Sequence, residues 1–250
     1  VVSNEIEYNN YLGTQIVLRN TLPILQKFVF ISTAYASGHR EGIIGDDFMT
    51  YSDFKFRNPY EQFKNRIEHE NVGFCEQNQI EWQILRPSII CGRLIDAPLY
   101  FIPRFSVFYL ICKIFYLLKK CLPADPMIRI YVASDPGLNI IPVDYVAKAI
   151  SRLIHSSIQQ VNLVHTTNVS ISDLFIMGLK EFNYKNFSLT EQSINEPTIF
   201  EKRYDKTINS QLLPYLDTPA HQFDSTLVRQ VLHDFKEPDV LAQFKGLIRF

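Results

Sequence analysis

The sequence lacks paired cysteines, a cluster of basic residues and any strong charge bias. Its cysteines form no C-x2-C pair and no zinc-type spacing, and they lie singly at Cys75, Cys91, Cys112 and Cys121. Single cysteines of this kind are typical of reduced thiols in a cytosolic protein. The formal net charge is -1 over 250 residues, whereas nucleic-acid-binding domains usually carry a basic stripe. We therefore expect a cytoplasmic protein with no metal site and no nucleic-acid partner.

Long uninterrupted apolar runs are also missing. Residues 99–118 come nearest, but Pro103, Arg104 and Lys113 interrupt them. A membrane-spanning helix needs about 20 apolar residues with few charges, so the segment predicts a different structure. Either it forms a helix that lines an apolar pocket or lies on a membrane surface, or it forms an ordinary core helix. The membrane-surface interpretation adds peripheral membrane contact through 99–118, and a membrane-associated location, to the expectations.

Apolar residues make up 46% of the chain, enough for one large domain or one domain with an added lobe. Helical and extended hydrophobic patterns alternate along it. The predicted strands are 28–31, 81–85, 128–132 and 161–165, and the predicted helices are 4–26, one from Pro59, one through Ala147 and one from Asp173. This alternation indicates an α/β fold, and the apolar run at 28–31 is typical of a strand buried on both faces of a parallel sheet.

The pair Tyr60 and Lys64 is the most informative local feature. Asn58 and Pro59 precede it as a candidate helix cap and first helical residue, and a spacing of four puts both side chains on one helix face. A free phenol has a pKa of about 10, and a nearby ammonium lowers that pKa. Such a tyrosine can exchange a proton with an alcohol or carbonyl while a cofactor moves a hydride. By itself, however, the pair more often marks an aromatic anchor beside a solvated lysine.

Five segments in a fixed order extend the argument beyond this pair. They are Asn-Tyr-Leu-Gly-Thr at 10–14, Phe-Ile-Ser-Thr-Ala-Tyr-Ala-Ser-Gly at 30–38, Tyr60-x3-Lys64, Leu-Arg-Pro-Ser-Ile-Ile-Cys-Gly at 85–92 and Ile-Pro-Val-Asp-Tyr-Val-Ala at 141–147. Together they resemble the extended short-chain dehydrogenase/reductase family of NAD-dependent epimerase/dehydratase-like proteins. The segments at 32–35, 86–90 and 142–147 are most similar to its fatty acyl-CoA reductase and carrier-protein thioester reductase branch.

The resemblance implies an α/β fold that comprises the C-terminal part of a Rossmann-like doubly wound parallel sheet and a mainly helical substrate lobe. We expect residues 1–98 and 128–168 to form the partial NAD(P)-binding domain. Residues 99–127 and 169–250 are expected to form the substrate-binding lobe. The resemblance also implies NADP or NAD as the cofactor.

Catalytic roles follow from the same resemblance for Thr33, Tyr60, Lys64 and Asn10. Tyr60 is the expected acid–base residue, and Lys64 is expected to lower its pKa and to bind the nicotinamide ribose. Thr33 is expected to hold the substrate carbonyl, with Ser32 as the neighbouring alternative, although either hydroxyl could instead cap the strand end. Asn10 is expected either to support a proton-relay water or to cap local backbone.

The implied cofactor contacts involve further residues at the strand ends. Besides Tyr60 and Lys64 they are Ser32, Pro87, Ser88, Ile89 and Ile90, and residues 87–90 are expected to line the nicotinamide end through their backbone. Two charged residues of the quoted segments are expected to be structural instead. Arg86 is expected to be buried and paired, and Asp144 to hold a helix start by capping.

The glycine-rich turn that opens such a fold is missing. Dinucleotide-binding domains begin with a strand, a Gly-x-x-Gly-x-x-Gly turn and a helix, yet none of the nine glycines forms this motif near the N-terminus. The glycines within 38–45 follow the predicted strand at 28–31, which is not the first strand of such a fold. Asp46 and Asp47 beside them would repel a phosphate. We expect residue 1, which is Val, to fall just after the fourth strand of the family sheet. Such a fragment holds the catalytic groups but binds a dinucleotide poorly alone and can be inactive.

Three functions are compatible with these observations. The first is an NAD(P)H-dependent reductase whose substrate is an acyl-CoA or acyl-carrier-protein thioester, or another lipophilic carbonyl. The second is a nucleotide-sugar epimerase or dehydratase, or a hydroxysteroid dehydrogenase, of the same fold. A nucleotide sugar needs basic groups for its diphosphate, for which Arg104, Lys113 and Arg129 are candidates in apolar surroundings. The third is a non-catalytic protein that senses a dinucleotide or scaffolds a complex.

Overall fold

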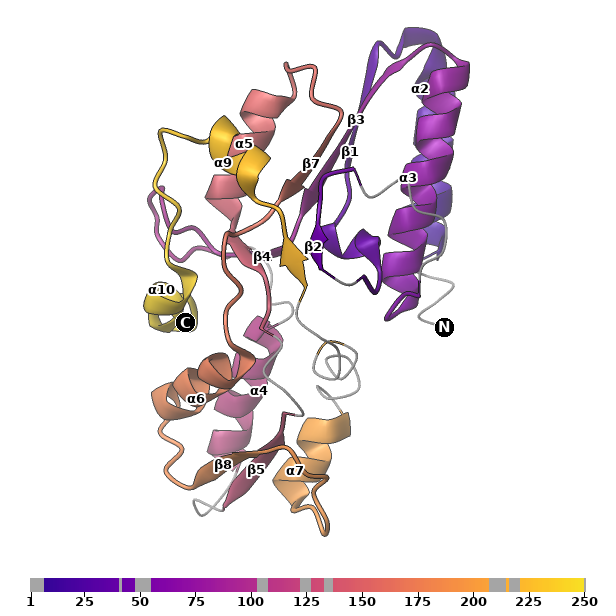
Figure 1. Ribbon diagram of the computed structural model, residues 1–250. Helices are drawn as coiled ribbons and strands as arrows, with labels where there is room; N and C mark the ends of the chain where they lie inside the picture. The colour runs from indigo at the N-terminus through magenta and orange to yellow at the C-terminus, as the bar shows by residue number, and fades with distance from the viewer. Residues whose placement is uncertain are drawn as a thin grey trace. The chain divides into compact units, whose positions relative to one another are not determined.

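The computed structural model describes residues 7–40, 42–47, 55–102, 108–121, 127–132, 137–206, 215 and 221–249 (Figure 1). These residues form two compact units. Unit 1 takes the described residues within Val1–Ile90, Tyr145–Thr166 and His221–Glu237, and unit 2 takes those within Cys91–Asp144, Thr167–Ala220 and Pro238–Phe250.

Several segments lie in a different unit from the one that the sequence predicts. Residues 91–98, 167–168 and the described residues of 128–144 were expected with the sheet domain but belong to unit 2, where β5 (Ile128–Tyr131) pairs in parallel with β8 (Phe187–Thr190). Residues 221–237 were expected in the lobe but belong to unit 1, where β9 (Gln222–Phe223) pairs in parallel with β2 (Ile43–Ile44). The β5–β8 and β2–β9 pairs join segments far apart in the chain, which local hydrophobic patterns do not reveal.

The centre of unit 1 is a parallel sheet with the strand order β1-β3-β7. Its strands are β1 (Lys27–Ile31), β3 (Glu81–Pro87) and β7 (Gln160–Leu163), which confirms three of the predicted strands. Ile31 is in register with Leu85, and Pro87 with Leu163. The carboxyl ends of the three strands therefore meet at one edge of the sheet.

Helices cover both faces of this sheet, as a doubly wound fold requires. On one side, α3 (Pro59–Gln77) lies beside α2 (Gly13–Thr21), and α5 (Val143–Leu153) lies on the other side (Figure 1). Of the predicted helix at 4–26, residues 4–6 lie outside the described residues, and the helical part comprises the π-helical turn η1 (Glu7–Leu12), α2 and the 3-10 turn η2 (Leu22–Ile24). Pro23 lies in that last turn, where it ends the α-helix as expected.

Between α2, α3 and the sheet, unit 1 buries an apolar cluster. Leu18, Cys75 and Ile80 are buried there, and Phe28 and Trp82 pack against them. The unit is completed by η3 (Ala34–Ser37) after β1 and by α9 (Thr226–Val231) after β9. The short strand β4 (Ile89–Cys91) follows β3.

Unit 2 is mainly helical. Its remaining elements are α4 (Phe108–Cys121), β6 (Ile140–Pro142), α6 (Ile171–Glu181), α7 (Ile199–Tyr204) and α10 (Val240–Leu247). An aromatic cluster fills its core around Phe115. The centroid of the Phe115 ring lies within 6.3 Å of the ring centroids of Phe175, Tyr184, Phe200 and Tyr204.

The apolar segment 99–118 ends in α4, and residues 103–107, which include Pro103 and Arg104, lie outside the described residues. The inner face of α4 buries Tyr109, Cys112 and Phe115, as a core helix does. Its outer face exposes Tyr116 and Leu117. No helix in the described part of the chain is long and apolar enough to cross a membrane.

Candidate active site

The residues singled out in the sequence gather at the carboxyl end of the parallel sheet in unit 1. Ser32 and Thr33 follow β1, and Pro87 ends β3. Two backbone bonds continue the sheet beyond its strands: the Ser32 N–H donates to the Leu85 carbonyl at 2.8 Å, and the Ser88 N–H donates to the Leu163 carbonyl at 3.0 Å. This edge is where open α/β sheets bind their ligands.

Thr33 caps the turn η3. Its Oγ1 accepts a hydrogen bond from the Tyr35 N–H at 3.3 Å, and its side chain is buried. The strand-end cap that the sequence allowed is therefore present. A hydroxyl that accepts one bond still has its own proton to donate, so capping fixes the Thr33 oxygen and leaves its O–H able to bind a carbonyl.

Ser32 and Ser88 carry buried hydroxyls without a hydrogen-bond partner among the described residues. A buried polar atom without a partner costs about 1–3 kcal/mol, and such atoms often mark a place where a ligand binds. Both serines were predicted to contact the cofactor. Of the other predicted contacts, Pro87 is buried, Ile89 is half-buried and Ile90 is exposed.

Tyr60 and Lys64 project from the first two turns of α3. Asn58 caps this helix by accepting a bond from the Glu61 N–H at 3.0 Å, and Pro59 is its first residue, both as predicted. The Lys64 ammonium donates to the Ile31 carbonyl at 3.3 Å and lies 5.9 Å from the centre of the Tyr60 ring. The pair thus shares one helix face beside the end of β1.

The electrostatics of Tyr60 differ from the expectation. Burial raises the pKa of Tyr60 above its ordinary value, and the neighbouring Glu61 carboxylate raises it further. Burial lowers the pKa of Lys64, although the Glu68 carboxylate partly opposes this. The predicted lowering of the Tyr60 pKa by Lys64 is absent because the ammonium donates to Ile31 and does not bond to the phenol. In this state Tyr60 is a phenol, the form that can donate a proton.

Asn10 lies in η1, and its side chain is outside the described part of the structure. Its predicted role in a proton relay therefore stays a prediction.

Arg86 is structural, as predicted. Its guanidinium is buried and binds the Glu68 carboxylate with an N–O distance of 2.8 Å. Asp144 also binds backbone, but its target differs from the expected helix start. Its carboxylate accepts bonds from the N–H groups of Leu94, Ile95 and Asp96 at 2.6–3.3 Å, so it holds a loop of unit 2.

Sequence reasoning missed several buried polar residues of α3 and their partners. Glu61, Asn65 and Glu68 are all buried on one face of the helix. Their spacing of four and three residues is a signal that the sequence contains, because polar residues at helical spacing share a face. No local signal marks His221, which contacts the Arg57 guanidinium from a distant part of the chain.

Comparison with known proteins places this arrangement in a family. The sequence matches the male sterility protein family of NAD-binding domains over residues 4–150, more than half of the chain and the part that holds Thr33, Tyr60 and Lys64. The chain belongs to this family. Membership confirms the predicted extended short-chain dehydrogenase/reductase fold and its reductase branch, a group of NAD(P)-dependent enzymes. No sequence among curated proteins matches the chain.

Solved structures support the same fold for this male sterility family member. The UDP-N-acetylglucosamine 4-epimerase from Methanobrevibacter ruminantium M1 is 15% identical with a TM-score of 0.63, over 97% of this chain and 67% of that chain. RMD from Pseudomonas aeruginosa, complexed with NADPH, is 13% identical with a TM-score of 0.65, over 96% and 71%. The terminal R domain from the myxalamid PKS-NRPS biosynthetic pathway is 18% identical with a TM-score of 0.63, over 97% and 62%. The chain thus spans about two thirds of the length of these structures.

The residues present fit an NAD(P) cofactor on its nicotinamide side. The unpaired hydroxyls of Ser32 and Ser88 supply polar contacts at the sheet edge, and the Lys64 ammonium supplies a positive charge at the end of β1. All three residues lie in unit 1.

Proposed function

We propose that this chain carries the catalytic groups of an NAD(P)H-dependent reductase that acts on an acyl thioester or another lipophilic carbonyl. The observation that carries the proposal is the gathering of Thr33, Tyr60 and Lys64 at the carboxyl end of β1, with Tyr60 held as a phenol. Membership in the male sterility family supports it, as does the similarity to the R domain of a biosynthetic pathway. When bound, NAD(P)H supplies a hydride.

Each residue has a distinct role in this proposal. The Thr33 O–H binds the substrate carbonyl oxygen, because its oxygen is already fixed by the Tyr35 N–H. The Tyr60 phenol donates its proton to the same oxygen as negative charge develops there. The Lys64 ammonium holds the ribose of the cofactor and keeps positive charge next to the phenol. A raised Tyr60 pKa suits reduction, since the reductive direction needs the protonated form.

In this proposal unit 1 is the cofactor-binding domain with the catalytic groups, and unit 2 is the substrate-binding lobe, each considered by itself. Leu99, Tyr100 and Phe101 are exposed apolar residues of unit 2, and α4 exposes Tyr116 and Leu117. A lipophilic acyl chain is the substrate class that such side chains suit. The same exposed residues of α4, together with the exposed Lys113 and Lys120 on that face, suit contact with an anionic membrane surface. We place the protein in the cytoplasm with this contact.

The nucleotide-sugar alternative needs basic groups that are available to bind a diphosphate, and one of the candidates is already paired. Arg129, one of the candidates for a diphosphate, forms an ion pair with the buried Glu201 carboxylate at 3.0 Å. Although burial opposes it, hydrogen bonds from Arg129 and Thr198 lower the pKa of Glu201 to about 2. This pair neutralises Arg129 and removes it from the candidates, while Arg104 lies outside the described residues and Lys113 is exposed on α4.

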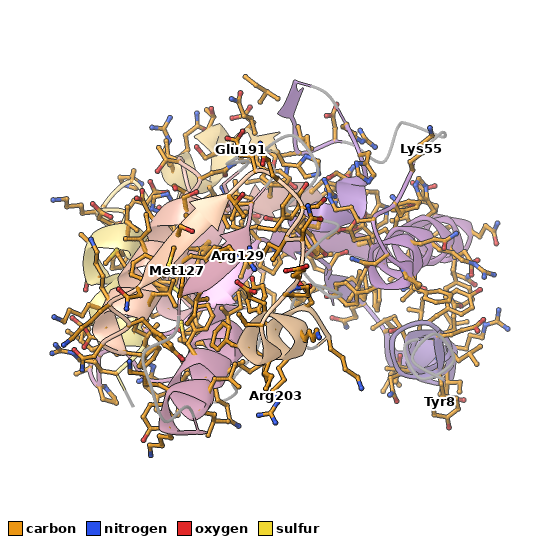
Figure 2. The ribbon with its side chains drawn as sticks, turned by 90° about the horizontal axis from the view of Figure 1, so that it is seen from below. Tyr8, Lys55, Met127, Arg129, Glu191 and Arg203 are labelled. Carbon is orange, nitrogen blue, oxygen red and sulfur yellow. The ribbon has the colours of Figure 1, made fainter. Side chains whose placement is uncertain are left out.

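The decisive experiment compares the full-length protein with its Tyr60→Phe variant. We expect NADPH oxidation with a long-chain acyl-CoA or acyl-carrier-protein thioester, and a loss of about 10²–10⁴-fold in kcat in the variant because the proton donor is removed. NADPH binding, followed by fluorescence, should persist. Tyr8→Phe is the matched control, since Tyr8 is 65% exposed and points away from its helix (Figure 2).

Other outcomes separate the alternatives. Turnover of a panel of nucleotide sugars without thioester reduction would favour the epimerase or dehydratase. Binding of NADPH without turnover of either panel would favour the non-catalytic sensor. Full thioester reduction by Tyr60→Phe would remove Tyr60 from the mechanism.

A further inference from the structure

The buried face of α3 is unusually polar. Four of its seven buried residues, Glu61, Asn65, Glu68 and Asn71, are polar or charged, and the other three are Ile67, Val72 and Cys75. A helix that packs on a sheet normally buries an apolar stripe, because charged side chains are almost never fully buried unless they are paired. The first three polar residues, Glu61, Asn65 and Glu68, lie on the same helical face as one another and we call them the polar row.

The first member of the row ties the start of α3 to the C-terminal part of unit 1. Glu61 accepts bonds from the backbone N–H of Arg57 at 3.1 Å and from its guanidinium at 3.2 Å. The same guanidinium contacts the ring of His221, which directly precedes β9. Glu61 is the residue next to Tyr60, so this contact fixes the helical turn that carries the phenol.

The second member ties α3 to the turn that Thr33 caps. The Asn65 Nδ2 donates to the carbonyl of Ala36 at 3.0 Å, and Ala36 lies within η3. Asn65 is the residue next to Lys64. One buried hydrogen bond therefore connects the helix of Tyr60 and Lys64 directly to the turn that orients the Thr33 hydroxyl.

The third member ties α3 to the end of β3. The Glu68 carboxylate accepts bonds from the Arg86 Nε at 3.0 Å and the Arg86 Nη2 at 2.8 Å. Arg86 immediately precedes Pro87 and lies two residues before Ser88. Its Nη1 also donates to the Asp46 carbonyl at 2.7 Å, so the same guanidinium holds the loop after β2.

Hydrogen bonds and apolar contacts constrain a helix differently. Apolar burial is non-directional, so an apolar face tolerates small rotations of a helix about its axis. Hydrogen bonds weaken steeply when the donor–hydrogen–acceptor angle falls. Three hydrogen-bonded side chains along one face therefore fix both the rotation of the helix and its position along its axis. Buried ion pairs add little stability compared with apolar packing, so stability alone does not account for the row.

We infer that Glu61, Asn65 and Glu68 are positioning residues that set the rotation of α3, so that Tyr60 and Lys64 face Thr33 and the Pro87–Ser88 segment. Each member connects α3 to a different segment of unit 1, and two of these segments carry predicted site residues. None of the three touches the reacting atoms. The inference rests on the proposed function for its effect on turnover, while the geometry that it describes does not depend on the substrate.

The test uses Asn65→Leu in the full-length protein, because leucine is close to asparagine in size but has no donor for Ala36. We expect kcat for thioester reduction to fall by about tenfold or more, since small misplacements of catalytic groups are costly. The KM of the thioester should stay within about twofold, because no substrate contact is removed, whereas the affinity for NADPH should weaken, because the rotation also moves the Lys64 ammonium that holds the ribose. Glu68→Gln keeps one acceptor oxygen for Arg86 but removes the charge that compensates its buried guanidinium, so it should lower the melting temperature of the protein.

Glu70→Gln is the matched control for these variants. Glu70 lies on α3 too, but it is exposed and pairs with Arg66 at 2.7 Å, so its change should leave kcat unaltered. An unchanged kcat in Asn65→Leu would overturn the inference. So would a fall in kcat that is fully explained by a loss of folded protein, as measured in thermal melts. So would an equal fall in the Glu70→Gln control.

A second readout does not need turnover. The ultraviolet titration of Tyr60 is obtained as the difference between each protein and the same protein carrying Tyr60→Phe. We expect its midpoint to shift in Asn65→Leu, because a rotated helix changes the surroundings that raise the Tyr60 pKa, and to stay in place in Glu70→Gln. If the parent protein reduces no thioester but this shift occurs, the positioning inference stands and the proposed function fails. If neither the Tyr60 titration midpoint nor kcat changes in Asn65→Leu, the inference is wrong.

Discussion

At the residue scale, the charge of Lys64 depends on pH. Burial lowers its pKa from the ordinary lysine value, so the ammonium is lost at a lower pH than in a free lysine. Burial raises the Tyr60 pKa, so the phenol keeps its proton to a higher pH than a free tyrosine. The two shifts move the loss of the Lys64 charge to lower pH and the loss of the Tyr60 proton to higher pH.

The corresponding prediction concerns the alkaline limb of the pH–rate profile. We expect thioester reduction by the parent protein to fall at alkaline pH when Lys64 deprotonates. In Lys64→Arg the side chain stays charged at all accessible pH values, so the fall should move to higher pH, whatever the absolute rate. The measurement is kcat/KM across the pH range for both proteins. An identical alkaline limb in both would assign it to another group.

Asp46 gives a second prediction at this scale. Its half-buried carboxylate accepts a bond from the Asn162 N–H at 2.5 Å, yet burial raises its pKa to about 6. A folded-state pKa above the unfolded value means that the folded protein binds the proton more tightly. Stability from this group is therefore greatest at acidic pH and is lost as the pH rises through about 6.

Asp46→Asn removes this titration while keeping an oxygen that can accept the Asn162 bond. We expect the variant to gain in melting temperature relative to the parent at pH 7.5, and to show no such gain at pH 4, where Asp46 is protonated in the folded state. Thermal melts at the two pH values check this. A gain of equal size at both would mean that the carboxylate charge is not the cause.

At the element scale, α4 shows how one helix serves two surfaces. Its inner face packs Phe115 into the aromatic core of unit 2, and its outer face exposes Tyr116 and Leu117 between lysines. The hydrophobic pattern of the sequence predicted a helix here and excluded a span. It could not decide between a core helix and a surface helix, because the packing of Phe115 and the exposure of Leu117 make it both.

The prediction for α4 is reduced membrane binding in Leu117→Glu. Leu117 is 47% exposed, so the change should leave the fold intact, while it adds a negative charge to a basic, apolar face. We expect weaker co-sedimentation with vesicles that contain anionic phosphatidylserine. Ile154→Glu is the matched control in unit 1, where Ile154 is 39% exposed. Equal binding by both variants and the parent would exclude α4 as the membrane contact.

At the scale of the whole molecule, the C-terminal part of the chain returns to complete unit 1. Phe223 is buried and meets the Tyr35 ring edge-to-face with a centroid distance of 5.7 Å, beside His221. Tyr35 lies in η3, the turn that Thr33 caps. A segment near residue 223 thus packs against the turn of a predicted catalytic residue nearly 200 positions earlier in the chain.

We expect Phe223→Ala to destabilise the protein by about 3 kcal/mol, the usual cost of a large-to-small change in a buried aromatic side chain. Ile199→Ala, at a side chain that is 71% exposed, should change stability by less than about 0.5 kcal/mol. Urea unfolding followed by circular dichroism measures both. A Phe223→Ala variant as stable as the control would mean that the contact with Tyr35 contributes nothing to the fold.

The sequence by itself determined the three sheet strands and the main helices of unit 1, and the family. Apolar runs gave β1 and β3, the Asn58-Pro59 pair gave the start of α3, and the order of five segments gave the short-chain dehydrogenase/reductase fold. These features are local, because strand burial, helix capping and motif spacing depend on residues close together in the chain. Arg86 could likewise be predicted as buried and paired, since a cation within an apolar strand needs a partner.

Only the tertiary structure decided which residues meet. It placed 128–144 in unit 2 and 221–237 in unit 1, paired Arg86 with Glu68, and turned the Lys64 ammonium toward the Ile31 carbonyl. It also reversed the expected pKa shift of Tyr60. The physical reason is common to all of these. Parallel strand pairing, burial and buried hydrogen bonds join groups that are distant in the chain, and no local pattern specifies the partner or the solvent exposure that sets a pKa.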